Sequence, residues 1–161
     1  MKTTPEMIIS LKDNEVFVFG SNASGFHGAG AAGLACRGIS KNTWRYDQWF
    51  LKAMKSPIGS PDRIGKWAIY GIAHGFQKGK EGKSYAIETI KKAGQKRSTS
   101  LEFITKQLKE LMKFAKENPN LEFLITKIGS SLAGYSIEEI KSCFDSLDFI
   151  PKNVSLPIEY Q

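Results

Sequence analysis

The residue types best suited to chemistry gather in a glycine-rich segment, residues 19–32, which reads FGSNASGFHGAGAA. Its glycines allow a backbone to approach a ligand without obstruction by Cβ atoms. The segment follows an apolar run and opens an alanine-rich stretch, so its amide N–H groups would lie at a helix start, where the helix dipole favours phosphate. It lacks the Gly-Lys-Ser/Thr ending of a P-loop, and Gly25, Gly28 and Gly30 do not form the G-x-G-x-x-G dinucleotide fingerprint. A glycine-rich turn without a ligand is an equal alternative for this loop alone.

A second segment, residues 123–135, repeats the pattern of strand, small-residue loop and capped helix in the sequence FLITKIGSSLAGY. If both strands are parallel and central, both loops emerge at the carboxyl edge of the sheet, where ligands of open α/β sheets bind. Two groups of amides facing one cleft would suit a diphosphate flanked by two sugars.

Four side chains are candidates for acid–base or phosphate chemistry. His27, within the first loop, could contact phosphate or exchange protons near neutral pH, although a ring that only braces the loop is the alternative. We interpret His74 as an ordinary loop histidine, with a position lining the cleft as the alternative. Lys83 and Lys127 could neutralise a phosphate, but most of the abundant lysines must be solvated. Neither loop carries paired carboxylates or an Asp-x-Asp motif, so a two-metal hydrolase is not expected.

Apolar runs and helical periodicity predict the elements that would position these loops. Thr99 with Glu102, and Ser136 with Glu139, are capping-box signatures of helix starts. The predicted strands are 15–19, 67–70, 84–87, 121–126 and 153–156. The predicted helices are 28–37, 46–54, 99–117 and 136–147. The apolar stripes of the last two helices are Leu101, Ile104, Leu108, Leu111 and Ala115, and Ile137, Ile140, Phe144 and Leu147.

This alternation predicts one α/β domain over residues 1–161, with three layers and a mostly parallel mixed sheet. The hydrophobic content of 41% is that of a globular protein. No apolar run approaches the roughly 20 residues that cross a bilayer. We expect no signal peptide and no membrane partner, and hence a location in the cytoplasm, that of the host cell if a phage encodes the chain.

The spacing of the cysteines and the charge of the chain limit the kinds of ligand and partner that we expect. Cys36 and Cys143 have no second ligand at metal-binding spacing, so we interpret both as buried structural residues and expect neither a metal nor a cofactor. The net charge is +7, and the stretch 78–97 holds seven basic residues against two acidic ones, a local charge of +5. Such a field favours anionic partners, either a small phosphorylated ligand or nucleic acid, or it marks a solvated basic loop.

The long motif of residues 18–32, VFGSNASGFHGAGAA, together with 126–134, TKIGSSLAG, resembles a group of phage and bacterial proteins related to macro domains. Residues 84–87, SYAI, and 153–157, NVSLP, are also similar to that group, so the resemblance spans most of the chain. It implies a three-layer macro-like α/β/α fold and a ligand of the ADP-ribose type.

The resemblance also implies roles for particular residues. Asn22 would lie near the distal ribose, and Leu132 or Tyr135 would cover the ligand. Phe26 or Tyr135 could stack on a base or ribose. Asp13 is the one weak candidate for the aspartate with which macro domains read the adenine amino group. The implied ligand-binding residues are Gly20, Ser21, Asn22, Gly25, His27, Gly28, Ala29, Gly30, Gly129, Ser130, Ser131, Leu132, Ala133, Gly134 and Tyr135.

The predicted function is binding of ADP-ribose or a related phosphorylated nucleotide derivative at the two glycine-rich loops. If the protein is an enzyme, it is predicted to hydrolyse an ADP-ribosyl or phosphate ester, with His27 and Asn22 as the catalytic residues and a bound water as nucleophile. The alternatives are a non-catalytic sequestering or reader module of phage origin, and a basic nucleic-acid-binding protein with tryptophans around Trp44. A purely structural protein would leave both glycine loops unexplained.

Overall fold

The computed structural model describes all residues, 1–161, as six strands and four α-helices. The strands are β1 (Lys2–Thr3), β2 (Glu15–Asn22), β3 (Gly75–Lys78), β4 (Lys83–Ile90), β5 (Glu122–Ile125) and β6 (Val154–Leu156). The helices are α1 (Gly30–Arg37), α2 (Gln48–Lys55), α3 (Leu101–Glu117) and α4 (Ile137–Asp145), with single 3-10 turns at 44–46, 61–63 and 158–160. None of the helices has the length and apolar character that a membrane crossing requires.

The strands form one mixed sheet in the order β1-β6-β5-β2-β4-β3. Every neighbouring pair is parallel except β3 and β4, which form an antiparallel hairpin. The predicted α/β class with a mostly parallel mixed sheet is therefore confirmed. The two central strands, β5 and β2, are those that precede the two glycine-rich loops.

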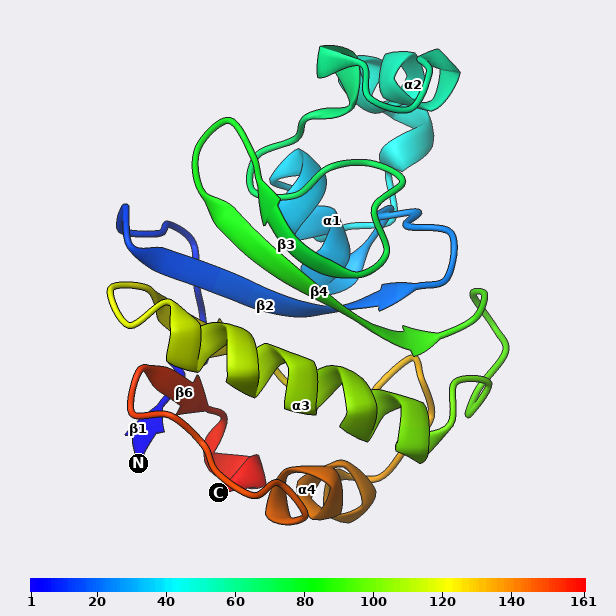
Figure 1. The fold of residues 1–161 in the computed structure, drawn as a ribbon. Helices are drawn as coiled ribbons and strands as arrows, with labels where there is room; N and C mark the ends of the chain where they lie inside the picture. Colours follow the sequence, from blue (N-terminus) through cyan, green and yellow to red (C-terminus); the bar gives the residue numbers. More distant parts are fainter.

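Helices cover both faces of the sheet, as Figure 1 shows. Successive side chains of a strand point to opposite faces. On β2, Val16 and Val18 accordingly join the larger apolar cluster with α3 and α4, whereas Phe17 and Phe19 join the smaller cluster with α1 and α2. All four side chains are at most 2% exposed, which confirms the prediction that this strand is buried on both faces.

Predictions for three segments were wrong at least in part: the strand 67–70, the start of α3, and the apolar stripe and end of α4. Residues 67–70 form no strand, only an isolated bridge between Ile64 and Ile69, and the hairpin partner of β4 is β3. Position 67 holds an apolar residue because its side chain is buried against the sheet. The Trp67 amide donates to Ala35 O, at the end of α1, and not to a strand. The cap of α3 is Ser100, which accepts from the Phe103 amide.

Thr99, the predicted cap of α3, instead donates its hydroxyl to Glu88. In α4 the capping box of Ser136 and Glu139 is confirmed, but Ile137 is 41% exposed and the helix ends before Leu147.

Candidate functional site

Both glycine-rich loops lie at one edge of the sheet. The strands β2 and β5 are hydrogen-bonded neighbours and run parallel, so the first loop (residues 23–29) and the second loop (residues 126–136) leave the same carboxyl edge. Thr126 binds the second loop to β2, because its amide and its hydroxyl both donate to Val18 O, at 3.1 and 2.7 Å. The geometric condition for a shared site is therefore met.

The Asn22 side chain shapes the first loop from within. Its Oδ1 accepts from the Phe26 amide at 2.9 Å and from the Ser24 hydroxyl at 3.0 Å, while its Nδ2 donates to Phe26 O at 3.0 Å. At Gly25, with φ +69°, a Cβ would collide with the backbone of Gly71, whose amide donates to Gly25 O. These contacts hold the loop against the segment that precedes β3.

His27 is fully buried and braces the first loop. Its Nε2 lies 2.9 Å from Ile72 O and its ring packs edge-on against Phe19, with 5.2 Å between centroids. Burial lowers the pKa of His27 to about 4, against the opposing effect of the hydrogen bond to Ile72 O. The imidazole is therefore neutral near pH 7 and faces the protein interior, so its position gives no support to the predicted role in proton transfer to a ligand.

The helix that follows the first loop begins without a side-chain cap. Its N-cap is Ala29, and the amides of Gly28, Ala29, Ala31 and Ala32 donate to no acceptor within the protein. Gly30, with φ +64°, donates to Ser40 O, and a Cβ built on it would meet no atom within 4 Å. Uncapped amides at the positive end of a helix dipole favour an anion.

The second loop presents a longer run of such amides. The five consecutive amides of residues 129–133 donate to no acceptor within the protein, while Tyr135 N closes the loop onto Gly129 O. The closure depends on positive φ angles at Gly129 (+78°) and Gly134 (+87°). Below the loop, the buried Tyr160 hydroxyl bonds Ile128 O at 2.8 Å and lies 2.7 Å from Ser130 Oγ.

Of the two residues predicted to cover a ligand, Tyr135 is only 6% exposed. Its hydroxyl donates to Thr99 O, and the Arg97 guanidinium lies over its ring at 4.7 Å while forming a two-pronged ion pair with Glu139. Leu132 is 73% exposed and is free to lie over a ligand. Phe26, the other predicted stacking residue, packs edge-on against aromatic neighbours of α2 and its flanks.

A cavity of about 840 Å³ lies beside the loops, between α1 and the segments that follow β1, β5 and β6. Its walls are residues 3–9 at the end of β1 and beyond it, Phe17 of β2, the α1 side chains Ala31 and Leu34, and the segments 38–41, 126–127 and 157–159. The wall holds two buried polar atoms that have no partner, Thr4 Oγ1 and Glu159 Oε2. The sequence did not point to this cavity, because its walls come from both ends of the chain and from separate segments between them.

The other oxygen of Glu159 accepts from Lys127 Nζ at 3.0 Å. That hydrogen bond lowers the pKa of Glu159, so the side chain is an anionic acceptor at neutral pH. The predicted contact of Lys127 with a phosphate thus competes with an ion pair already present.

Asp13 and Lys83 lie at the opposite, amino edge of the sheet. Asp13 precedes β2, and Lys83, the first residue of β4, donates its Nζ to Asp13 O. Neither side chain is therefore placed to contact a ligand at the two loops.

The basic stretch 78–97 is divided between the two edges. Its first part forms the turn between β3 and β4, and its last part forms the third loop (residues 91–100) at the carboxyl edge. The eight residues of β4 separate the two by roughly 25 Å, at about 3.3 Å per residue.

Arg37, at the end of α1, is a structural residue of this site that the sequence did not reveal. Its side chain is only 1% exposed and donates to the carbonyls of Gly28, Ile39 and Lys41 at 2.9 to 3.3 Å. It also pairs with Asp47, the N-cap of α2, at 3.3 Å. Arg37 thereby connects the first loop to α2. The sequence signal that could have revealed this role is a single arginine at the end of an otherwise apolar, alanine-rich helix.

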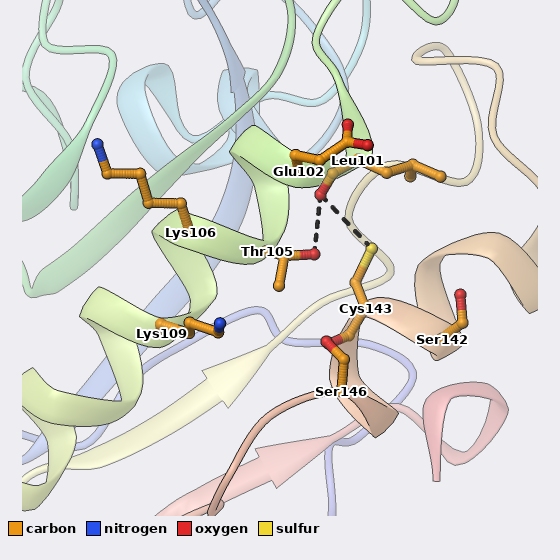
Figure 2. A pocket seen from close by; sticks show the side chains of 8 residues that line it. All are labelled: Leu101, Glu102, Thr105, Lys106, Lys109, Ser142, Cys143 and Ser146. Carbon is orange, nitrogen blue, oxygen red and sulfur yellow. Dashed lines mark hydrogen bonds between the residues drawn. The ribbon is translucent and has the colours of Figure 1, made fainter.

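A smaller hollow of about 430 Å³ lies between α3 and α4 (Figure 2). Cys143 faces Leu101 O at its base, and burial raises the pKa of the thiol, which is then protonated at neutral pH. Cys36 is 1% exposed, and both cysteines are unpaired, which agrees with their interpretation as buried structural residues.

No protein-family model matches this chain, and no curated protein matches it in sequence.

Proposed function

We propose that the chain binds ADP-ribose, or a closely related nucleoside diphosphate sugar, along the carboxyl edge of its sheet, in a macro-like α/β/α fold. The observation that carries the proposal is the two sets of unpartnered amides, at residues 28, 29, 31 and 32 and at residues 129–133, which follow adjacent parallel strands beside a cavity of about 840 Å³. Amides already oriented at a helix start or in a tight loop bind phosphate oxygens without reorganisation.

The strand order gives the ligand a direction. The cavity is lined by the segments that follow β1, β6 and β5, and the amide runs follow β5 and β2. The base and first ribose would occupy the cavity, the diphosphate would lie on the amides, and the second ribose would extend past Asn22 towards β4.

The two unpartnered oxygens of the cavity fit an amino-substituted base better than Asp13 does. Both oxygens are buried, so contact with a base requires the two side chains to turn towards the cavity; an anionic Glu159 Oε2 would then accept from an exocyclic amine, and the Thr4 hydroxyl would donate to a ring nitrogen. Satisfying buried polar atoms on binding adds affinity and selectivity, because the same atoms stay unpaired with the wrong base.

Binding is the activity that these contacts support most directly, and it would serve a reader or a phage protein that sequesters a nucleotide signal. Hydrolysis of an ADP-ribosyl or phosphate ester at the exposed end remains part of the proposal, through groups other than the buried His27.

Nucleic-acid binding is less well supported. The basic stretch is divided between two edges, and Trp44 packs against Phe26 with 5.0 Å between ring centroids. The basic stretch and Trp44 therefore do not form one continuous basic and aromatic surface.

Calorimetric titration with ADP-ribose, NAD, ADP and cyclic ADP-ribose tests the proposal. We expect saturable binding of ADP-ribose that is tighter than that of ADP and that depends weakly on salt. Absence of saturable binding for all four ligands, or DNA binding that falls steeply with salt, would overturn it.

A variant pair tests the base contact. Glu159→Gln should reduce the preference for ADP-ribose over its hypoxanthine analogue. Glu122→Gln is the matched control, since Glu122 is another lysine-paired glutamate but begins β5 at the amino edge. Equal selectivity of both variants and the unmodified protein would remove Glu159 from the site.

A further inference from the structure

His74 belongs to a polar cluster at the carboxyl edge that neither glycine loop contains. Its Nε2 lies 3.0 Å from Oε1 of Glu88, a β4 residue whose side chain is 4% exposed. The other oxygen of Glu88 accepts from the Thr99 hydroxyl at 2.9 Å and from Lys91 Nζ at 3.2 Å. Phe103 packs against both the His74 ring and the Lys91 ammonium.

Glu88 is held in its anionic form. Burial would raise its pKa, but hydrogen bonds from Thr99, Lys91 and His74 outweigh burial and lower it. The carboxylate therefore orients the imidazole through Nε2, while the His74 side chain is 51% exposed and its Nδ1 bonds no other protein atom. A buried acid that orients an accessible histidine is the arrangement used in acid–base catalysis.

The cluster adjoins the first loop on the side away from the cavity. The carbonyl of Ala73 accepts from Ser21, and Glu88 is the partner of Ser21 in the register of β4 with β2. The Ala23 amide donates to the carbonyls of Ile90 and Lys91, at 3.2 Å each. Along the edge, the cavity, the amide runs and the cluster thus follow in the order β6, β5, β2, β4.

We propose that His74 is a catalytic residue that transfers a proton at the far ribose of the bound ligand, with Glu88 as its positioning residue. This proposal rests on the proposed binding of ADP-ribose derivatives. A ligand with its base in the cavity and its diphosphate on the amides brings its last ribose towards β4. Lys91 adds a cation beside the imidazole, so the end of the site suits a substrate with a terminal anionic group, an ADP-ribose 1″-phosphate.

The reaction is hydrolysis of the phosphate monoester. Water attacks phosphorus, the bond from phosphorus to the ribose oxygen breaks, and its electron pair stays on that oxygen. The protonated imidazole gives its Nδ1 proton to the ribose oxygen, and a proton of the attacking water restores the imidazole. The products are ADP-ribose and inorganic phosphate.

Two measurements made in parallel test the proposal on the whole chain: phosphate release from ADP-ribose 1″-phosphate, and calorimetric binding of ADP-ribose. In His74→Ala, kcat should fall on the order of 10²- to 10⁴-fold, the usual contribution of a general acid, with the ADP-ribose Kd unchanged. Added imidazole should restore part of the rate. His74→Gln, which keeps a hydrogen bond to Glu88, should be equally slow and serves if His74→Ala fails to fold.

Glu88→Gln should lower kcat while leaving KM unchanged, because it misorients the imidazole without touching the ligand. Lys92→Ala is the control for loss of one charge from the exposed third loop, and its rate should equal that of the unmodified protein. Retained turnover in both His74 variants overturns the proposal. So does a protein that binds ADP-ribose and releases no phosphate, and in that case the binding function stands. Absence of ADP-ribose binding overturns the binding function and this inference together.

Discussion

Filling the open space at Gly30 should separate ligand binding from folding. Gly30 adopts φ +64° between the unpartnered amides of Ala29 and Ala31, and a Cβ there meets no atom within 4 Å. In Gly30→Leu the new Cβ therefore clashes with nothing in the protein, and we expect the rest of the side chain to occupy the open space beside these amides. Gly59 is a matched control, since it has φ +89°, equally open surroundings and a position beyond α2.

The magnitudes of the two effects differ. A left-handed conformation costs a non-glycine residue about 1–2 kcal/mol. For a chain of this length that corresponds to a fall in Tm of roughly 2–8 °C, which Gly30→Leu and Gly59→Leu should share. Hydrogen bonds to a charged phosphate contribute about 1.5–3 kcal/mol each, so their loss should weaken binding by about 3 kcal/mol, or roughly 100-fold in Kd, in Gly30→Leu alone.

Thermal unfolding followed by circular dichroism and calorimetric titration with ADP-ribose measure the two effects. Equal affinities for ADP-ribose in Gly30→Leu and Gly59→Leu would refute the placement of the ligand on the first loop. A much larger fall in Tm for Gly30→Leu would show that the space is needed for folding rather than for a ligand.

Three further predictions follow from buried groups. His27 has a pKa of about 4 in the native protein, whereas in the unfolded chain it binds a proton below about pH 6.5. The free energy of unfolding should therefore fall between pH 6.5 and pH 4 by on the order of 3 kcal/mol more than it does in His27→Gln. Urea unfolding with the same pH dependence in both proteins would contradict this prediction. Arg37→Met leaves three carbonyls and Asp47 without their donor and should cost about 3–5 kcal/mol in urea unfolding, so a loss near zero would contradict its bracing role. Burial raises the pKa of Cys36 to about 12, so a thiol reagent at pH 8 should label Cys36 only after unfolding, and rapid labelling of Cys36 in the native protein would contradict its burial.

The elements that the sequence predicted correctly are those with strong local signals. The apolar run that became β2 and the capping box of Ser136 with Glu139 each determine their own conformation. The strands β1 and β3 were missed because Lys2–Thr3 and Gly75–Lys78 contain no apolar run, and they are strands only through pairing with β6 and β4. Trp67 was mistaken for a strand residue because burial in a loop and burial in a strand require the same side chain.

The sequence predicted where the two backbone loops of the candidate site lie, but not the contacts of the side chains around them. Glycine spacing placed both loops after strands, and parallel pairing then placed them at one edge. The burial of His27 and the pairing of His74 with Glu88 depend on residues 45 and 14 positions away in the sequence, whereas the hydrogen bonds of Arg37 depend on the path of the nearby irregular segment 38–47. A lone histidine among glycines reads as accessible in sequence, yet the segment before β3 closes over it.

Titration of the ¹⁵N-labelled protein with ADP-ribose, followed by amide NMR, tests the shared site most directly. We predict that the amides of Gly28–Ala32 and of residues 129–133 shift together in one saturable event, with the strongest changes at Ala31 and Ser131. Shifts confined to one of the two loops, or to the basic third loop alone, would contradict a single ligand bound by both.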